Sequence, residues 1–539
     1  MGAFIMPQLS TFLSTRAMLL AAGILFLSGC ASQAPPAEAQ TATHPEQALI
    51  EDLVLANRML ASRELSVLDA FGHVSMRSRT NPNHYFISRY VAPGMVATSD
   101  IIENDLESKP VSGARPDEYR EVYIHGEIYK ARPDVMSIVH SHSPELVAFS
   151  VSSIPLRNGD NVVPIFDIRK FKGDGSGLIN TPAMGQAMAE SLGRSNSILL
   201  LGHGVVVTSN SVYSLVSNVN GLRNTARLQQ MLISMGGTWD PNPRRVTAQP
   251  NTPQTSPAQQ TQQAVVPSGT GGGRGGERGW EYWKQLVLKL TDGKVPVSSP
   301  PAPAGASSPD DALKQDLAHA NRMLASPELG ILDAFGHVSV RNPRNPNHYF
   351  ISRYISAGVV TPNDIIENDL DSQPAAGPRS DEYQEVYMHG EIYKARPDVI
   401  AVLHAHTPEI VAFTQSSVTL RPVVNGGAFI GDGLPMFDIR KFDPRETIIT
   451  SPALGRAVAQ ALGNRPAVLL KGHGIALTDS SLNGLISRAY NLRVNARIQQ
   501  QAIALGGKIE YLPQQPALPP AAAGFDRAWE YWKRIIPAN

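Results

Sequence analysis

HGEIYKARPDVIAVLHAH, residues 389–406, is one of two nearly identical segments in this chain, and the other, HGEIYKARPDVMSIVHSH, occupies residues 125–142. The first eleven residues of the two segments are the same. Each segment ends in a His-x-His pair after an apolar, β-branched run, a pattern typical of a buried strand. Side chains two residues apart on a strand share one face, so both imidazoles stand together and suit a divalent metal. A single His-x-His pair can also arise by chance, so its meaning depends on its surroundings.

The two segments belong to a longer repeat. NPNHYFISRY at residues 81–90 equals residues 345–354 letter for letter, at the same offset of 264 positions that separates the His-x-His segments. A chain of 539 residues is too long for one hydrophobic core. Because the period is that of a domain, we expect a tandem duplication of one globular unit rather than a solenoid.

Composition narrows the range of functions. The chain holds 47 basic and 47 acidic residues, and this balance gives no sign of a nucleic-acid surface, so we expect no nucleic-acid partner. The single cysteine, Cys30, excludes an intrachain disulfide and a thiolate metal cluster. Candidate metal ligands are therefore histidines and carboxylates.

Cys30 stands in a segment that resembles a bacterial lipoprotein signal peptide. Arg16 precedes an apolar run, residues 17–27, that is too short for a comfortable membrane span and leads into Ser-Gly-Cys. The resemblance implies that Cys30 is lipidated and anchors the protein to a membrane. Ala31 after it favours the bacterial cell envelope, at the periplasmic face of the outer membrane. The alternative is an ordinary secretory signal or a short anchor.

We expect five parts along the chain. They are a signal peptide over residues 1–30, a flexible tether over 31–44, a first domain over 45–240, a Pro-, Gln- and Gly-rich linker over 241–308 and a second domain over 309–539. Trp-Glu-Tyr-Trp-Lys occurs at residues 280–284 and again at 529–533, which predicts a short aromatic helix near 278–291 and another at the end of the second domain. Such a helix docks on a neighbouring unit or closes its own domain, and the sequence leaves both alternatives open.

Most histidines recur in both repeats. Twelve of the 14 are paired: His73 with His337, His84 with His348, His125 with His389, His140 with His404, His142 with His406, and His203 with His473. A catalytic metal needs about three protein ligands and an open position, and the His-x-His pair with the histidine of a Gly-His-Gly turn supplies three. Glu121 and Glu385 lie four residues before His125 and His389, where helical spacing places them on the same face. Each carboxylate could ligate the metal or move a proton.

Each repeat resembles the class II aldolase/adducin family over nearly its whole length. The pattern is (acid)-x3-H-x2-IY-x-RPDV-x3-H-x-H, with His-Gly some sixty to seventy residues later. The resemblance implies an α/β fold of two tandem α/β/α layered domains, each around a central, mostly antiparallel sheet. It also implies the metal ligands His140, His142 and His203 in the first repeat, His404, His406 and His473 in the second, and Glu121 and Glu385 as catalytic acid/base residues. Family members are commonly oligomers with sites near subunit interfaces, so we expect a homo-oligomer.

The sequence departs from the sugar-phosphate aldolases of this family. Gly-His-Val-Ser at residues 72–75 and 336–339 and Ile-Ser-Arg-Tyr at 87–90 and 351–354 stand where those enzymes hold phosphate. These elements resemble the subgroup of decarboxylases of hydroxylated aromatic or ring-cleavage acids, such as 3,4-dihydroxyphthalate decarboxylase. Arg89 and Arg353 are candidates to bind a substrate carboxylate, and a structural ion pair is the alternative. The residues His73, His337, His125 and His389 either line the site or lie behind it as buried histidines.

The two repeats differ in length after the His-x-His pair. Residues 420–437 of the second repeat are seven longer than residues 156–166 of the first. In relatives this region helps to cover the site, so we expect the second repeat to be the more active one. A tandem chain also suggests that two chains complete a four-unit ring.

These observations favour a metal-dependent carbon–carbon lyase, a decarboxylase or an aldolase, that acts on a small hydroxy- or oxo-carboxylic acid. Zinc suits three imidazoles, and manganese and magnesium remain open because carboxylate and substrate oxygens serve those ions. The alternative is a non-catalytic envelope protein that uses an adducin-like fold for binding or assembly.

Overall fold

A computed structural model describes residues 44–114, 117–171, 176–237, 284–285, 288–289, 294–296, 309–377, 382–444, 446–513 and 525–535. Nearly all of them belong to the second of two compact units, Met1–His44 and Pro45–Asn539. The predicted signal peptide and Cys30 lie outside the described residues, so the lipid anchor stays a prediction, as do the domain boundaries. Among the helices of the described residues, none is both long enough and apolar enough to cross a membrane.

The first repeat is built around a seven-stranded sheet with the order β3-β2-β1-β4-β9-β8-β7. Its elements are α1 (Gln47–Ala61), β1 (His73–Arg77), β2 (His84–Ser88), η1 (Pro93–Met95), η2 (Thr98–Asp100), β3 (Ile101–Asp105), α2 (Val122–Ala131), β4 (Ser137–Ser141), α3 (Pro144–Ser150), β5 (Arg157–Asn158), β6 (Asn161–Val162), β7 (Ile165–Phe166), η3 (Ile168–Lys170), α4 (Pro182–Leu192), β8 (Ser197–Leu200), β9 (Gly204–Ser209) and α5 (Val212–Ser234). Neighbouring strands of this sheet are antiparallel except β7 and β8.

The second repeat has the same strand order, β12-β11-β10-β13-β16-β15-β14, with β14 and β15 as its parallel pair. Its elements are α7 (Pro309–Ala325), β10 (His337–Arg341), β11 (His348–Ser352), η5 (Ala357–Val359), η6 (Pro362–Asp364), β12 (Ile365–Asp369), α8 (Val386–Ala395), β13 (Ala401–Ala405), α9 (Pro408–Gln415), η8 (Asn425–Ile430), β14 (Met436–Phe437), η9 (Ile439–Lys441), α10 (Pro452–Leu462), β15 (Ala467–Leu470), β16 (Gly474–Asp479), α11 (Leu482–Ala504) and α12 (Phe525–Ile535). The predicted duplication and the predicted α/β fold with mostly antiparallel sheets are confirmed.

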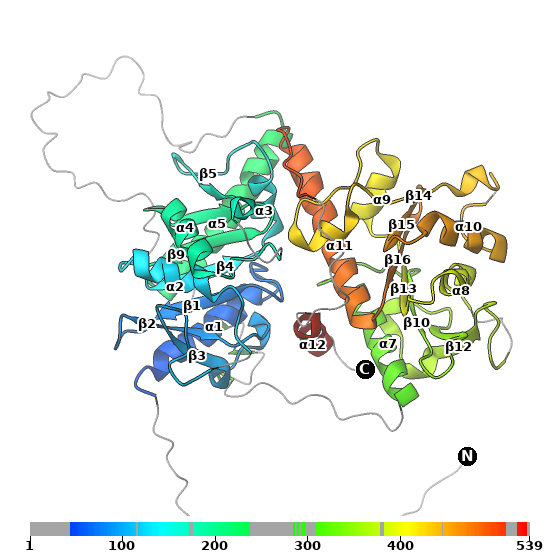
Figure 1. Ribbon diagram of the computed structural model, residues 1–539, viewed down its shortest axis with the longest axis horizontal. Coiled ribbons are helices and arrows are strands. Elements are labelled where there is room, and N and C mark those ends of the chain that lie inside the picture. The colour runs from blue at the N-terminus through cyan, green and yellow to red at the C-terminus, as the bar shows by residue number, and fades with distance from the viewer. Residues whose placement is uncertain are drawn as a thin grey trace, which may run out of the picture. The chain divides into compact units, whose positions relative to one another are not determined.

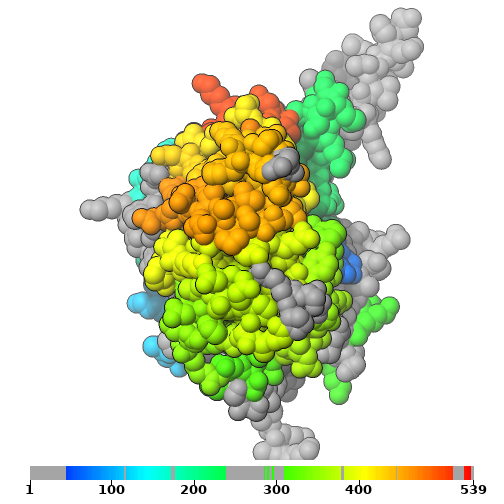
Figure 2. All heavy atoms as spheres, turned by 90° about the vertical axis from the view of Figure 1, so that its right-hand side faces the viewer, coloured from blue at the N-terminus to red at the C-terminus, as the bar shows by residue number. Residues whose placement is uncertain are grey.

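Side chains alternate in direction along each strand, and this alternation gives the sheet a hydrophobic core on each face. In β4, Val139 packs into a core with α1, α3 and α5, while Ile138 packs into a second core with α2 and α4 on the other face of the sheet. Side chains of a strand point to opposite faces in turn, so His140 lies on the same face as Ile138, the side of α2 and α4. The second repeat repeats this arrangement, with α8 and α10 on one side of its sheet and α7, α9 and α11 on the other (Figure 1). On this side of the second repeat, the yellow-green and orange segments of the chain form one continuous surface (Figure 2).

The helix starts follow ordinary capping rules. Proline occupies the first turn of α3, α4, α9 and α10, where its missing N–H costs nothing. The Thr181 hydroxyl accepts the backbone N–H of Met184, and the Ser211 hydroxyl accepts that of Ser214. These local signals fix where each helix begins relative to the strands that carry the histidines.

The C-terminal helix α12 contacts both repeats. Its Trp529 and Trp532 are buried in the core of the second repeat, and the same cluster includes Ala70 and Ala92 of the first. A Cβ at Gly94 would stand 2.7 Å from the Tyr531 ring, so glycine is needed for the close approach of this helix. The terminal helix therefore both closes its own domain and docks on the neighbouring repeat. Its counterpart near residues 278–291 falls largely outside the described residues.

The two repeats contact each other through different surfaces, so the contact is heterologous. Residues Val147, Ala148 and Val151, in or just after α3 of the first repeat, share a core with Ile498 and Ala502 of α11. The backbone continues this contact, because the N–H of Ser153 donates to the Lys508 carbonyl (2.9 Å) and that of Glu510 to the Val151 carbonyl (2.7 Å). The first repeat thus contributes its α3 side, and the second contributes its α11 side.

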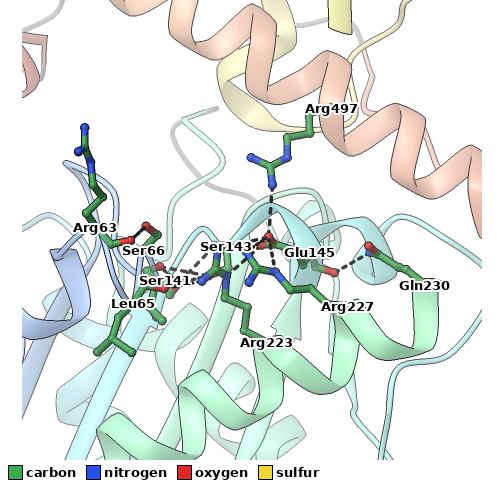
Figure 3. Close-up of polar contacts among 11 residues, drawn as sticks. Arg63, Leu65, Ser66, Ser141, Ser143, Glu145, Arg223, Arg227, Gln230 and Arg497 are labelled. Carbon is green, nitrogen blue, oxygen red and sulfur yellow. Dashed lines mark hydrogen bonds and ion pairs between the residues drawn. The ribbon is translucent and has the colours of Figure 1, made fainter. Parts of the chain in front are cut away.

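Glu145 of α3 holds this contact together through charge. Its side chain is 2% exposed and accepts hydrogen bonds from Arg223 and Arg227 of α5 and from Arg497 of α11 (Figure 3). Burial alone would raise the pKa of this carboxyl, but Arg223 and Arg497 lower it to about 2. The equivalent residue of the second repeat, Glu409, is less buried and pairs with Arg493.

We expect Glu145→Gln to destabilise the protein by about 3–5 kcal/mol at neutral pH, because it leaves three guanidinium groups around a neutral side chain. The folded-state pKa lies below the ordinary value of 4.5, so the stability that this group contributes is present above pH 4.5 and is lost as pH falls toward 2. That contribution is about 3 kcal/mol at 1.36 kcal/mol per pKa unit. Urea unfolding of both proteins across this pH range is the measurement.

Glu409→Gln is the matched control and should cost less, since a half-buried pair with one arginine gains less from its charge. Equal losses for the two variants, or an identical pH slope in the wild type and Glu145→Gln, would contradict the role of Glu145.

Candidate metal centre

Four side chains converge at the end of β4. Glu121, His140, His142 and His203 each offer one ligand atom, and these atoms lie within 4.8 Å of one another. In the second repeat the equivalent residues do the same: they are Glu385, His404, His406 and His473. The structure brings together the residues that the sequence singled out as ligands and acid/base groups. That they hold a metal stays a prediction.

Three strands place these side chains. His140 and His142 come from the end of β4, and the pairing of β4 with β9 sets His140 opposite Val206. The turn between β8 and β9 brings His203 to the same edge of the sheet. Glu121 is the residue at which α2 begins, on the face of the sheet that His140 shares.

Distances among the imidazoles suit a metal. His142 Nε2 lies 3.0 Å from His140 Nε2, and in the second repeat His406 Nε2 lies 2.9 Å from His404 Nε2 and 3.1 Å from His473 Nε2. Nitrogens at the corners of a tetrahedral zinc site with Zn–N bonds of ~2.0–2.1 Å stand about 3.3 Å apart. The donor set therefore fits a divalent ion that prefers imidazole, with one carboxylate beside it.

The Nδ1 atoms of the two histidines in each His-x-His pair lie next to hydrogen-bond acceptors on the side away from the other imidazoles. His142 Nδ1 is 3.1 Å from Asp69 Oδ1, and His140 Nδ1 is 3.2 Å from the Val205 carbonyl oxygen. Each acceptor keeps the proton on Nδ1 and leaves the Nε2 lone pair for a metal. The second repeat repeats both contacts, with Asp333 behind His406 and the Ile475 carbonyl behind His404.

Asp69 and Asp333 were not singled out from the sequence, although Leu-Asp-Ala-Phe-Gly-His recurs at 68–73 and 332–337. Burial would raise the Asp69 pKa, but His142 and the backbone N–H groups of Phe71 and Gly72 lower it to about 2. An ionised Asp69 favours the imidazole orientation that a metal needs.

Glycines flank the third histidine because the turn is crowded. A Cβ on Gly204 would stand 2.6 Å from the Ser141 carbonyl oxygen and 2.8 Å from the His140 ring. Gly202 has φ +62°, which most side chains disfavour. The close approach expected from the Gly-His-Gly motif is present.

A cavity of about 250 Å³ opens in front of the first cluster, and both repeats line it. The first repeat contributes Asp69, Phe71, His73, Tyr90, Tyr119, Arg120, Glu121, His142, Val147, Leu178, Gly202 and His203; the second contributes Val424, Asn425, Gly426, Tyr490, Asn491, Val494, Ile498 and Arg527. The second repeat thus forms one wall of the first repeat's site.

The comparison with known proteins agrees with this geometry. The family described as Class II Aldolase and Adducin N-terminal domain matches residues 51–230 and 315–500.

The chain belongs to the class II aldolase and adducin family.

Several proteins of this family are similar to the chain. Decarboxylase tropJ of Talaromyces stipitatus is 32% identical over 189 residues, which are 32% of this chain and 71% of that protein. The 3,4-dihydroxyphthalate decarboxylase of Arthrobacter keyseri is 30% identical, over 40% of this chain and 91% of its own. Human beta-adducin is 24% identical, over 34% of this chain and 26% of its own. Among solved structures, an aldolase II superfamily protein from Pseudomonas syringae is 21% identical and has a TM-score of 0.37, covering 43% of this chain and 94% of its own.

Within this class II aldolase fold, the two additional histidines of each repeat take different places. His73 lines the cavity, whereas His125 lies behind it with no exposed surface. His73 Nδ1 is 2.8 Å from His125 Nε2, and His125 Nδ1 is 2.6 Å from the Ser75 hydroxyl, which in turn contacts Tyr129. Burial lowers the pKa of His125 to about 3, so this chain of groups is neutral. The second repeat has the same chain, from His337 through His389 and Ser339 to Tyr393.

The arginines of the Ile-Ser-Arg-Tyr motif are engaged elsewhere. Arg89 Nε is 2.8 Å from Asp100 Oδ1, and Arg353 Nε is 2.8 Å from Asp364 Oδ1. Arg89 is not among the residues that line the cavity. This geometry favours the structural ion pair, which the sequence left open as the alternative to a carboxylate-binding role.

The longer segment of the second repeat lies at the first repeat's site. Asn425, at the start of η8, donates its side-chain N–H to the Gly177 carbonyl (2.9 Å) and its backbone N–H to the Gly202 carbonyl (3.2 Å). The part of the expectation that these residues cover the second repeat's own site is not matched by the contacts of Asn425, and which repeat is the more active one stays a prediction. The physical reason is that packing of α11 against α3 brings η8 to the neighbouring repeat.

The second site is more open. Phe335 and Tyr354 are 61% and 56% exposed, although their equivalents in the first repeat, Phe71 and Tyr90, are partly buried at the cavity. The Asp333 side chain is 46% exposed, compared with 19% for Asp69. The same ligand set thus stands in two different environments.

We expect Asp69→Asn to weaken divalent-metal affinity at the first site by about 10- to 100-fold, because the amide no longer favours the required His142 tautomer. Titration of the protein with zinc against a competing chelator should resolve two sites in the wild type and one weakened site in the variant. Asp134→Asn, which removes an exposed partner of Arg132, is the control and should leave both affinities unchanged. An unchanged first site in Asp69→Asn would contradict the assignment.

Proposed function

We propose that this protein is a metal-dependent carbon–carbon lyase that decarboxylates a small hydroxy- or oxo-carboxylic acid or cleaves it by aldol chemistry. The observation that carries the proposal is the convergence of three imidazoles and one carboxylate at the wall of a cavity, in a family whose relatives include decarboxylases. The same four groups are kept in the second repeat.

His140, His142 and His203 would hold the metal in the first site, and His404, His406 and His473 in the second. When bound, a divalent ion supplies a Lewis acid that stabilises the negative charge on substrate oxygens as the carbon–carbon bond breaks. Zinc matches three imidazole ligands, and manganese or magnesium would rely more on carboxylate and substrate oxygens.

The glutamate of each cluster is oriented for proton transfer. The backbone N–H of Ile179 donates to Glu121 Oε1 (3.1 Å), and Ile449 does the same for Glu385 (3.0 Å). The other oxygen, Oε2 of Glu121, lies 3.7 Å from His140 Nε2 and faces the site. Burial would raise the Glu385 pKa, but His404 and His473 hold it well below its usual range, which favours the ionised form that accepts a proton.

His73 also lines the cavity. Its pKa lies well below the usual value because it is fully buried beside His125 and Arg527, so a neutral imidazole faces the cavity. Such a ring can hydrogen-bond a substrate hydroxyl or carbonyl group without adding charge.

A non-catalytic role in binding or assembly is the second candidate, and the similarity to human beta-adducin is the observation that favours it. Both complete ligand sets support the enzyme instead, since an assembly role needs neither.

Replacement of both glutamates, Glu121→Gln with Glu385→Gln, should lower the turnover of zinc-loaded protein at least about 100-fold, because proton transfer is lost while metal ligands remain. Release of carbon dioxide or aldehyde from a panel of hydroxylated aromatic acids, 2-oxo acids and sugar phosphates is the measurement. The control is Glu127→Gln with Glu391→Gln on the same helices, where the carboxylates pair with Lys130 and Lys394. A wild-type protein that binds metal tightly yet converts no member of the panel would favour the assembly role.

We also propose that two chains associate. A heterologous contact that is used once leaves one surface of each kind without a partner among the described residues, here the α5 side of the first repeat and the α9 side of the second. Those two surfaces match the pair that already meets within the chain, so a second copy can close a four-unit ring. Sedimentation of the detergent-free full chain should show a dimer, and a strictly monomeric profile at micromolar concentration would contradict the ring.

A further inference from the structure

A buried guanidinium group faces the first site from the second repeat. Arg527 belongs to α12 and is 7% exposed, and it lines the cavity in front of His142 and His203. Trp529 and Trp532, on the same helix, are buried in the core of the second repeat and hold the helix in place. The position of this arginine is therefore set by tertiary packing, far along the chain from the metal ligands.

Aromatic rings surround the Arg527 guanidinium, and they offer it few hydrogen-bond acceptors. The Cζ atom of Arg527 lies 4.5 Å from the ring centre of Tyr90, 4.7 Å from that of Tyr119 and 5.8 Å from that of Phe71. Its Nη2 donates to the Gly72 carbonyl (3.3 Å). Within the described ranges, Nε and Nη1 have no hydrogen-bond partner, and no carboxylate forms an ion pair with this arginine.

A buried guanidinium that forms no ion pair is stabilised when an anion binds beside it. Removal of a guanidinium from water has a large free-energy cost, and aromatic faces offset only part of it. Arg223, which is also buried, is matched by Glu145, whereas the buried Arg77 donates to several backbone carbonyls. Arg527 instead lines a cavity, and two of its buried nitrogens have no hydrogen-bond partner within the described ranges. A guanidinium in this state can bind a ligand carboxylate through paired hydrogen bonds.

The neighbours of Arg527 connect it to the metal ligands. Tyr119, against which the guanidinium lies, has its ring centre 4.3 Å from that of His73, and the His73 ring is 5.3 Å from the His140 ring. One small ligand can therefore contact Arg527 at one end and the histidine cluster at the other. The cavity, at about 250 Å³, is below the ~300–1,000 Å³ of sites for drug-sized molecules, which also indicates a small ligand.

We propose that Arg527 binds the carboxylate of the acid in the first site and so turns the hydroxyl or carbonyl end of that acid toward His140, His142 and His203. This inference rests on the proposed function, because it assumes that the cluster holds a metal and that the ligand is an acid. It assigns to Arg527 the role that the sequence suggested for Arg89, which Asp100 occupies.

One consequence is that the two sites of a single chain are unequal. The second repeat supplies Arg527 to the first site, and the position that corresponds to it in the first repeat is Arg278, which precedes Gly-Trp-Glu-Tyr-Trp-Lys and lies outside the described residues. The first site is thus the one that the described part of the chain completes by itself.

A matched pair of ligands tests the inference. 3,4-Dihydroxybenzoate and catechol share the two hydroxyl groups that can chelate a metal, and only the first has a carboxylate. Their binding is measured by calorimetry on zinc-loaded full chain that carries His406→Ala to weaken the second site. Arg527→Gln should reduce the affinity for 3,4-dihydroxybenzoate about 10- to 100-fold, the usual loss for a hydrogen bond to a charged group, and change that for catechol less than about twofold.

Two further variants separate charge from packing. Arg527→Lys keeps the charge without the planar fork and should give an intermediate affinity for the acid. Arg534→Gln removes an arginine from the same helix that does not line the cavity, and should leave both affinities unchanged. Thermal unfolding followed by tryptophan fluorescence checks that α12 remains docked in each variant.

The outcomes distinguish this inference from the proposed function. Equal losses for the two ligands in Arg527→Gln, or no loss for either, would overturn the role of Arg527 and leave the metal site standing. Wild-type protein that binds catechol but not the acid would do the same. Wild-type protein that binds zinc but neither ligand would overturn both the inference and the proposed acid chemistry.

Discussion

The pairing of the central strand with its two antiparallel neighbours is the constraint on which the rest of each repeat depends. In the first repeat, β4 sets His140 opposite His73 on one side and opposite Val206 on the other. This register places a candidate ligand histidine, a cavity-lining histidine and the turn that bears His203 at one edge of the sheet. A shift by one residue would turn His140 to the opposite face, away from α2 and Glu121. The layered helices and the site therefore follow from the same hydrogen-bond register.

The packing of one repeat against the other makes two equal units unequal. Both carry the same strand order and the same four converging side chains. Because the α3 side of one meets the α11 side of the other, the first site receives a wall from η8, α11 and α12, while Phe335 and Tyr354 at the second site stay exposed. Both repeats thus keep the same four side chains, and the asymmetry of the contact decides which of the two clusters the described chain encloses.

The two buried charged groups, Glu145 and Arg527, differ in how their loss of contact with water is compensated. Glu145 is surrounded by three arginines, which satisfy its oxygens and join α3, α5 and α11. Arg527 is surrounded by aromatic rings and one carbonyl, and two of its nitrogens find no partner within the described ranges. The first arrangement stabilises the protein by itself. The second becomes favourable when an anion enters the cavity, which is the property of a binding site.

The sequence by itself determined the repeat, the strand that presents His-x-His, and the histidines and glutamate that converge, because strand periodicity and near-identical segments are local properties. It also contained Asp69 and Arg527, but nothing local marked them as important. Only the tertiary structure showed that Asp69 supports His142, that Arg89 is occupied by Asp100, and that η8 and Arg527 reach the first site across the contact between repeats. The physical reason is that tertiary packing, rather than any local pattern, brings these residues together. It acts within the first repeat for Asp69 and Arg89, and between the repeats for η8 and Arg527.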